Sequence, residues 1–221
     1  LDNMMREKYV SLWGLESKYE FIEADVRNRE TLQNAFVDVD TVFDLVGITN
    51  APISFERKEL TIDVNVNGVK NILEFALKND ANYVYSSTAS VYGNTDGKAV
   101  NEDVECHPQS PYGESKLLAE KEIQKVEREN GLKAKILRLS TVHGWSSGIR
   151  FDIAANKFTY FACMGMPLTV WSSAVNEFRP YIHVKDASRA LMHALKRNLK
   201  GIHNVEGENI QMGDLLELVK R

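Results

Sequence analysis

Two tyrosines in this 221-residue sequence are each followed four positions later by a lysine, an arrangement that could serve proton transfer. Tyr112 and Lys116 open a long run with helical spacing, whereas Tyr181 and Lys185 lie in an alternating, β-branched run that indicates a strand. On a helix, residues four apart lie on one face within about 6 Å, whereas four residues of a strand span roughly 13 Å. We therefore expect electrostatic coupling only between Tyr112 and Lys116.

That coupling has a chemical use. A phenol with a pKa near 10 is a poor base at neutral pH, and a neighbouring ammonium group favours the phenolate. We expect Lys116 to lower the pKa of Tyr112 and to make it a proton shuttle. The spacing alone also fits an ordinary surface helix, so the interpretation needs support from a second element.

A hydroxyl cluster supplies that support. Ser86, Ser87 and Thr88 stand where a short apolar run ends, and their hydroxyl groups could hold a reacting alcohol. The alternative is that they cap their own backbone. A hydroxyl cluster at a strand end, followed by a helix that carries the tyrosine and the lysine, favours a catalytic site.

The elements that must position these residues are short apolar runs that alternate with longer amphipathic ones. Strands are predicted over 21–24, 41–47, 82–87, 135–140 and 202–206. Helices are predicted over 66–77, 118–126 and 187–195, where apolar residues recur with helical spacing. This alternation predicts an α/β fold with a doubly wound parallel sheet, covered by helices on both faces. Such a sheet binds ligands at the carboxyl ends of its strands.

Composition excludes several classes of protein. The chain has 27 Lys and Arg against 31 Asp and Glu, for a net charge of −4, which argues against nucleic acid as the main partner. No apolar run approaches the roughly 20 residues of a membrane span. The two cysteines are too few for a secreted disulfide framework, so we expect a reducing, cytoplasmic compartment. No metal-ligand motif occurs, and no metal is expected.

At this point the sequence resembles a known family, the extended short-chain dehydrogenase/reductase enzymes, in their NAD-dependent sugar-nucleotide epimerase/dehydratase group, which includes UDP-glucose 4-epimerase. The segments that carry the resemblance run over nearly the whole chain in the family's order. They are LDN (1–3), FIEADVRN (21–28), DVNVNGVKNILEFA (63–76), YVYSSTASVYG (83–93), SPYGESK (110–116) and RPYIHVKDASRAL (179–191).

The resemblance implies a role for each matching residue. Thr88, Tyr112 and Lys116 would be catalytic, with Tyr112 taking the proton from a sugar hydroxyl as hydride leaves the same carbon. Lys116 would lower the pKa of Tyr112 and bind the nicotinamide ribose, and Thr88 would steady the hydroxyl. Together with Tyr112 and Lys116, the residues expected to bind NAD are Asp2, Asn3, Asp25, Val26, Leu45, Val46, Gly47, Asn65 and Ser86. Those expected to bind a nucleoside-diphosphate sugar are Thr88, Thr141, Asn156 and Arg179. A homodimer through helices at 64–79 and 112–130 is also implied.

The main departure from the family is the missing glycine-rich loop, since no G-x-G-x-x-G occurs in the chain. That loop precedes the ribose-binding acid by roughly 20 residues, and counting back from Asp2 places it before residue 1. We therefore expect a chain truncated at its N-terminus that lacks the first strand, glycine loop and helix. Residues 1–140 would form an incomplete NAD-binding, Rossmann-like domain. Residues 141–221 would form a mixed region that contributes part of a small substrate-binding region and returns to the main sheet.

The residues after Thr88 narrow the expected reaction. Sugar-nucleotide dehydratases of the family place Asp-Glu there and decarboxylating relatives often place Ser-Glu, whereas this chain has Ala89-Ser90. We therefore expect epimerisation of the sugar, at C4. Three alternatives stay open. One is another sugar-nucleotide enzyme, a dehydratase or a reductase. The second is a non-catalytic protein with this fold. The third is a serine esterase, because residues 144–148 match G-x-S-x-G around Ser146, and Asp186 and His203 follow in the required order.

Overall fold

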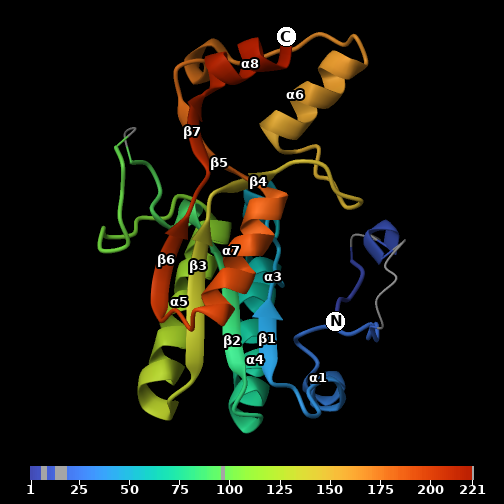
Figure 1. The fold of residues 1–221 in the computed structure, drawn as a ribbon, viewed down its shortest axis with the longest axis vertical. Helices are drawn as coiled ribbons and strands as arrows, with labels where there is room; N and C mark the ends of the chain where they lie inside the picture. Colours follow the sequence, from blue (N-terminus) through green and yellow to red (C-terminus); the bar gives the residue numbers. More distant parts are fainter. Residues whose placement is uncertain (6–8, 13–18, 96–97, 221) are drawn as a thin grey trace.

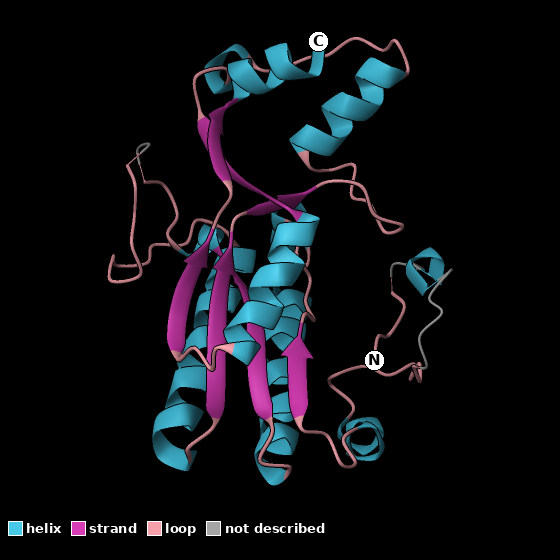
Figure 2. Cartoon of the chain, viewed as in Figure 1, coloured by secondary structure: helices cyan, strands magenta, loops and turns pink. Residues whose placement is uncertain are grey.

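A four-stranded parallel sheet forms the centre of the protein in the computed structural model, which describes residues 1–5, 9–12, 19–95 and 98–220. Its strands lie in the order β1 (Thr41–Asp44), β2 (Asn82–Thr88), β3 (Lys133–Leu139) and β6 (Gly201–Val205). Helix α7 (Val184–Lys196) covers one face, and α4 (Gly68–Lys78) and α5 (Pro111–Asn130) cover the other (Figures 1 and 2). The predicted α/β fold with a doubly wound parallel sheet is thus confirmed.

The two faces of the sheet bury separate apolar clusters. On the face covered by α4 and α5, side chains of the strands pack against Ile72, Leu73 and Ile123 of the helices. On the other face, Leu137 and Leu139 of β3 pack against alanines of α7. Burial on both sides explains why the strands are almost continuously apolar.

The start of α5 is set by local chemistry. The side chain of Ser110 accepts a hydrogen bond from the Gly113 amide at 3.1 Å, and Pro111 occupies the first turn. The helix ends at Gly131, whose φ of +74° suits glycine in a left-handed cap. Because the N-cap lies just before Tyr112, the tyrosine is held in the first turn, beside the carboxyl end of β2.

A second, smaller sheet lies beyond the carboxyl ends of the main strands (Figure 1). It contains β4 (Thr141–His143), β5 (Phe178–His183) and β7 (Glu208–Gln211), and it is accompanied by α6 (Ala154–Cys163) and α8 (Met212–Lys220). Between β5 and β7 the chain returns to the main sheet through α7 and β6.

Shorter helices complete the part of the chain that the structure describes. They are η1 (Tyr9–Leu12), α1 (Arg29–Ala35), α2 (Ala51–Glu56), α3 (Lys58–Ile62), the π-helical segment η2 (Asp63–Asn67), η3 (Ala89–Val91) and η4 (Ser172–Ala174).

Two of the predicted strands differ from the structure. Residues 21–24 form only an isolated parallel bridge, Asp2 to Glu23, rather than a strand of the sheet. Strand β1 ends at Asp44 instead of continuing to residue 47. It ends there because the side chain of Asp44 accepts the Val46 amide at 3.1 Å, so the backbone turns away from the neighbouring strand.

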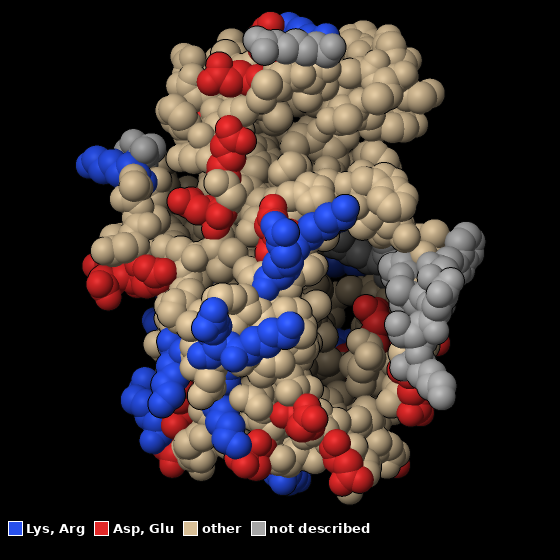
Figure 3. All heavy atoms as spheres, in the orientation of Figure 1, with Lys and Arg blue, Asp and Glu red and all other residues tan. Residues whose placement is uncertain are grey.

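Charge is unevenly spread over the surface. On the face drawn in Figure 3, lysines and arginines gather at the lower left, over β6 and the lower end of α5. This basic region lies at the end of the main sheet opposite to the carboxyl ends of its strands. Across the described residues, no helix is long and apolar enough to span a bilayer, and no three His, Cys, Asp or Glu side chains group in a way that could hold a metal ion.

Candidate active site

Thr88 and Tyr112 meet at the carboxyl end of β2. Thr88 is the last residue of β2, and its hydroxyl shares a hydrogen bond with the phenol of Tyr112. The Thr88 hydroxyl also donates to Ser90 Oγ at 3.2 Å and accepts the Ser90 amide at 3.2 Å. The backbone amide of Tyr112 donates to Ser54 Oγ of α2 at 3.1 Å, which anchors the first turn of α5. The structure thus brings together the predicted hydroxyl and the predicted base.

The electrostatic setting of Tyr112 differs from the expectation. Burial raises the pKa of Tyr112, and the hydrogen bond with Thr88 and the positive charge of Arg150 oppose this rise. The predicted lowering of this pKa by Lys116 is therefore wrong for this structure: desolvation outweighs the attractive charge, and the cation that acts on the phenol is Arg150.

Arg150 lies in the loop between β4 and α6, and nothing in its local sequence marks it as a site residue. Its guanidinium donates to Thr49 Oγ1 at 3.1 Å and to both carboxylate oxygens of Asp152, at 3.0 and 2.5 Å. Asn50 also donates to Asp152, at 3.0 Å. These contacts tie the loop of Arg150 to the segment that follows β1, and only the folded chain places the arginine near Tyr112.

Lys116 is almost completely buried, with 2% of its surface exposed. Its ammonium donates to the Ser86 carbonyl at 2.9 Å and to the Val46 carbonyl at 3.4 Å, and it lies 4.6 Å from the centre of the Tyr85 ring. Burial lowers the pKa of Lys116 to about 8, and the charges of Asp44 and Glu120 partly oppose this shift. Lys116 therefore joins the ends of β1 and β2 through two residues, Val46 and Ser86, that are themselves predicted to bind the cofactor.

Gly47 and Asn65 form the wall beside Lys116. Asn65 is buried, and its side chain binds both backbone groups of Ile48, at 2.8 and 3.1 Å, and Ser115 Oγ at 2.9 Å. A Cβ atom on Gly47 would lie 3.0 Å from Asn65 Oδ1 and 3.4 Å from Lys116 Nζ. The backbone after β1 is thus held close to the lysine, at a place that only glycine fits without displacement.

The residues predicted to bind the adenosine end also lie close together. Asn3 donates to Asp25 at 3.0 Å, and Asp2 bridges to the same segment through Glu23; Val26 is buried beneath it. Arg27 donates to both oxygens of Asp25, at 2.9 and 2.8 Å. This pair holds the pKa of Asp25 well below its usual range, so a ligand that binds Asp25 must compete with Arg27.

The predicted substrate residues are less closely associated. Thr141 begins β4 and is half-buried. Asn156 is buried, and its side chain binds two backbone groups of the loop 144–150, each at 2.9 Å, so it orders the loop that carries the active-site cation. Arg179 is exposed and pairs with Glu177 at 2.6 Å. No contact joins Arg179 to the tyrosine in the part of the chain that the structure describes.

A buried ion pair joins α5 to β3 next to the site. Glu120 and Arg138 have side chains 1% and 4% exposed, and Arg138 binds both carboxylate oxygens with bonds of 2.7 to 3.3 Å. The Ser87 hydroxyl donates to Glu120, and Arg138 donates to the Tyr92 hydroxyl at 2.8 Å. Because Glu120 follows Lys116 by one turn of α5, this pair fixes the helix against β2 and β3.

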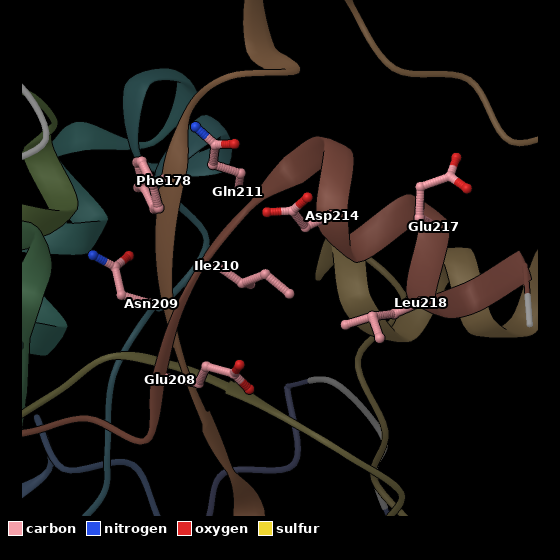
Figure 4. A pocket seen from close by; sticks show the side chains of 8 residues that line it. All are labelled: Phe178, Glu208, Asn209, Ile210, Gln211, Asp214, Glu217 and Leu218. Atoms are coloured by element: carbon pink, nitrogen blue, oxygen red, sulfur yellow. The ribbon is translucent and has the colours of Figure 1, made fainter.

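A hollow between β7 and α8 is separate from these residues (Figure 4). It is lined by three acidic side chains, Glu208, Asp214 and Glu217, together with the apolar side chains of Phe178 and Leu218 and others. None of the predicted site residues lines it. It therefore does not belong to the tyrosine–lysine site.

The esterase alternative is not supported by the geometry. A nucleophile elbow joins a strand directly to a helix, whereas Ser146 lies in the loop between β4 and α6. Asp186 instead pairs with Arg189, and the ring of His203 contacts the Lys200 carbonyl at 2.9 Å. Each of the two residues thus has a local partner of its own.

The described residues fit NAD at two places. At one, the acceptor groups of Asp2, Asn3 and Asp25 suit ribose hydroxyls and an adenine amino group. At the other, the glycine backbone beside Lys116 leaves room for close approach, and the exposed side chain of Leu45 offers apolar surface to a ring. The first region is polar and the second is partly apolar. Two unlike regions suit NAD, because its two ends differ.

Several known proteins are similar to this chain. UDP-glucose 4-epimerase from Azospirillum brasilense is 29% identical over 199 residues, which cover 81% of this chain and 56% of that protein. The crystal structure of UDP-glucose 4-epimerase from Thermus thermophilus in complex with NAD is 27% identical, with a TM-score of 0.79, and the match covers 90% of this chain and 67% of that one. DesIV, a dTDP-glucose 4,6-dehydratase from Streptomyces venezuelae, has a TM-score of 0.85 at 21% identity, covering 95% and 65%, and shows similarity of fold alone.

The chain thus spans between about half and two thirds of the length of these proteins. The family described as "NAD dependent epimerase/dehydratase family" matches residues 3–211. This match covers nearly the whole chain and confirms the resemblance found in its sequence and NAD as the cofactor of its family. The chain belongs to the NAD dependent epimerase/dehydratase family.

Proposed function

We propose that this protein is a nucleoside-diphosphate-sugar 4-epimerase that uses NAD. The observation that carries the proposal is the hydrogen-bonded pair of Thr88 and Tyr112 at the carboxyl end of β2, with Lys116 buried one helical turn further on. A hydroxyl, a phenol and an ammonium group at this position can bind and deprotonate an alcohol. A sugar hydroxyl is such an alcohol.

Each residue has a stated task in this reaction. Thr88 hydrogen-bonds the reacting sugar hydroxyl, and Tyr112 Oη takes its proton and later returns it. Lys116 would bind the cofactor ribose and supply a positive charge at the ends of β1 and β2. Arg150 opposes the rise in the pKa of Tyr112 and so makes proton transfer easier. NAD, when bound, supplies a reversible hydride acceptor and leaves the cycle unchanged.

The residues after Thr88 support epimerisation over loss of water. Elimination needs a further acid or base near the sugar. The positions that follow Thr88 are Ala89 and Ser90, and the Ser90 hydroxyl is already an acceptor for Thr88. Of the described charged groups, the one that acts on the Tyr112 phenol is the cation of Arg150. Epimerisation needs a proton to leave and return to one hydroxyl, which Tyr112 can carry. It also needs a hydride to leave the same carbon and return to its opposite face, which NAD would accept and give back.

We assign the binding of the cofactor and of the substrate to the residues that the family resemblance implies. The cofactor would lie along Asp2, Asn3, Asp25, Val26, Leu45, Val46, Gly47, Asn65 and Ser86. The substrate would lie along Thr141, Asn156 and Arg179, with its diphosphate at Asn156 and Arg179. The two groups come from residues 1–140 and 141–221, which we propose act as the cofactor-binding and substrate-binding parts. A homodimer through α4 and α5 is proposed as well, and light scattering of the purified protein tests it.

Product analysis of the full-length protein tests the function. The protein is incubated with UDP-glucose or dTDP-glucose, and the products are separated and weighed by mass spectrometry. An epimer of unchanged mass supports the proposal, whereas a product lighter by one water shows a dehydratase. No turnover of either sugar nucleotide, together with no dinucleotide released on denaturation, overturns it.

A pair of variants tests the assignment of the base. Tyr112→Phe should lower turnover by at least about 100-fold and leave the fold and NAD binding intact. Tyr181→Phe removes the hydroxyl of the other tyrosine with a lysine four positions later and should leave turnover unchanged. Equal turnover of the two variants overturns the assignment.

A further inference from the structure

Asp44 is a buried carboxylate that the proposed reaction does not use. It is the last residue of β1 and is only 1% exposed. Its Oδ2 accepts the Tyr83 hydroxyl at 2.5 Å, and its Oδ1 accepts the Val46 amide at 3.1 Å. Both carboxylate oxygens thus accept from donors, which suits the ionised form. Burial raises the pKa of Asp44, and these two bonds and the charge of Lys116 oppose that rise.

Lys116 lacks a direct ion pair among the described residues. The groups that its ammonium contacts are two carbonyls and the ring of Tyr85. Two carboxylates act on it from a greater distance, Asp44 from β1 and Glu120 from its own helix. Glu120 is already bound on both oxygens by Arg138, so its charge is largely neutralised. Of these two carboxylates, Asp44 is the one that forms no ion pair with an arginine among the described residues.

Two stacked aromatic rings contact the two groups, one ring each. Tyr83, which donates to Asp44, stacks on Tyr85 with ring centres 6.3 Å apart, and the ammonium of Lys116 lies over Tyr85. All of these side chains are buried. Burial makes Tyr83 and Tyr85 harder to ionise by raising the pKa of each, so both rings stay neutral. Water does not screen the attraction in such surroundings, and the interaction between the charges is stronger than at the surface.

We propose that Asp44 is a positioning residue that keeps Lys116 protonated and holds the Val46 carbonyl against its ammonium. The first role is electrostatic, and the second follows because Asp44 binds the amide of the residue whose carbonyl Lys116 contacts. Its importance for turnover rests on the proposed function, in which Lys116 must be charged. The protonation state itself does not depend on that function.

Titration of Lys116 by nuclear magnetic resonance tests the electrostatic role. Full-length protein is labelled with ¹³C at lysine Cε, and the Lys116 signal is assigned with Lys116→Met. We expect a midpoint in the parent protein near the pKa of about 8 to which burial lowers Lys116. In Asp44→Asn, which keeps the size of the side chain but removes its charge, the midpoint should fall by about one pH unit. The exposed Asp80, which pairs with Lys133, supplies the matched control: Asp80→Asn should leave the Lys116 midpoint in place.

Two further variants keep the test decisive if Asp44→Asn does not fold. Tyr83→Phe removes one hydrogen bond to Asp44 but retains its charge, and it should shift the Lys116 midpoint less than Asp44→Asn. Coupling is reciprocal, so Lys116→Met should raise the midpoint of the Asp44 carboxyl, followed by its ¹³C signal. A Lys116 midpoint unchanged by Asp44→Asn, or an Asp44 midpoint unchanged by Lys116→Met, overturns the proposal.

Activity measurements separate this proposal from the proposed function. If the protein turns over a sugar nucleotide, Lys116 in the Asp44→Asn variant should lose its proton at lower pH than in the parent protein. The alkaline limb of the variant's pH–rate profile should therefore lie about one pH unit lower. Absence of turnover overturns the proposed function but leaves the titration result on Asp44 valid. Turnover with an unmoved midpoint overturns the role of Asp44 alone.

Discussion

Removal of Arg138 should be one of the most damaging single substitutions in this protein. The Glu120 carboxylate is 1% exposed, and Arg138 forms its only ion pair among the described residues, through bonds of 2.7 to 3.3 Å. In Arg138→Met the carboxylate keeps only the hydrogen bond from Ser87. Breaking a buried pair by removing one partner costs about 3–5 kcal/mol, because an uncompensated charge stays in the interior.

Urea denaturation followed by circular dichroism measures this effect. A protein of this size loses about 2 kcal/mol of stability per molar urea, so a loss of about 4 kcal/mol lowers the midpoint by about 2 M. Arg189→Met is the matched control, since Arg189 forms an exposed pair with Asp186, and such pairs contribute about 0–1 kcal/mol. Its midpoint should therefore move by less than about 0.5 M.

A double variant separates the charge from the packing. In Glu120→Leu with Arg138→Met, no charge stays buried, and replacement of both partners by apolar residues is often close to neutral. The remaining cost should be the unpaired hydroxyl of Ser87, at most about 1–3 kcal/mol, because the Tyr92 hydroxyl still donates to Asn204 Oδ1 at 2.7 Å. The reasoning is refuted if Arg138→Met destabilises no more than Arg189→Met, or if the double variant is less stable than Arg138→Met.

Two more predictions concern pH. Arg150→Met removes the cation that opposes desolvation of Tyr112, so the pKa of Tyr112 should rise further. The tyrosine limb of the rate profile should then move to higher pH by up to about one unit; an unmoved limb, or one at lower pH, contradicts the placement of Arg150. Arg27 holds the pKa of Asp25 below its ordinary value, so this contact stabilises the fold above about pH 4 and is lost as pH falls. Because the pair is partly exposed, Asp25→Asn should cost about 0.5–1 kcal/mol at pH 7 and less at pH 3; a cost that grows on acidification contradicts it.

Local sequence was sufficient to place the proposed base on a helix and its proposed hydroxyl partner at the end of a strand. Ser110 and Pro111 start a helix by chemistry confined to one turn, so Tyr112 and Lys116 could be placed on a helix without knowledge of the rest of the chain. The apolar run that ends at Thr88 could likewise be identified as a strand by its length and composition. The same signals failed for residues 21–24, where the chain forms a single bridge, because pairing to a neighbouring strand is not a property of the segment itself.

The protonation behaviour of the site came only from the tertiary structure. The sequence pointed to Lys116 as the charge acting on Tyr112, but the fold buries the phenol and brings Arg150 to it from a distant loop. Asp44 also gave no signal, since an acid at the end of an apolar run is ordinary until Tyr83 and Lys116 are seen around it.

Sequence by itself thus determined the order of elements, the family and which side chains could react, because helix caps and hydrophobic periodicity act over a few residues. Tertiary structure decided which charges those side chains feel and how deeply they are buried. The reason is that desolvation and Coulomb interactions depend on distance in space, and the fold brings together residues such as Asp44, Tyr112 and Arg150 that are far apart along the chain.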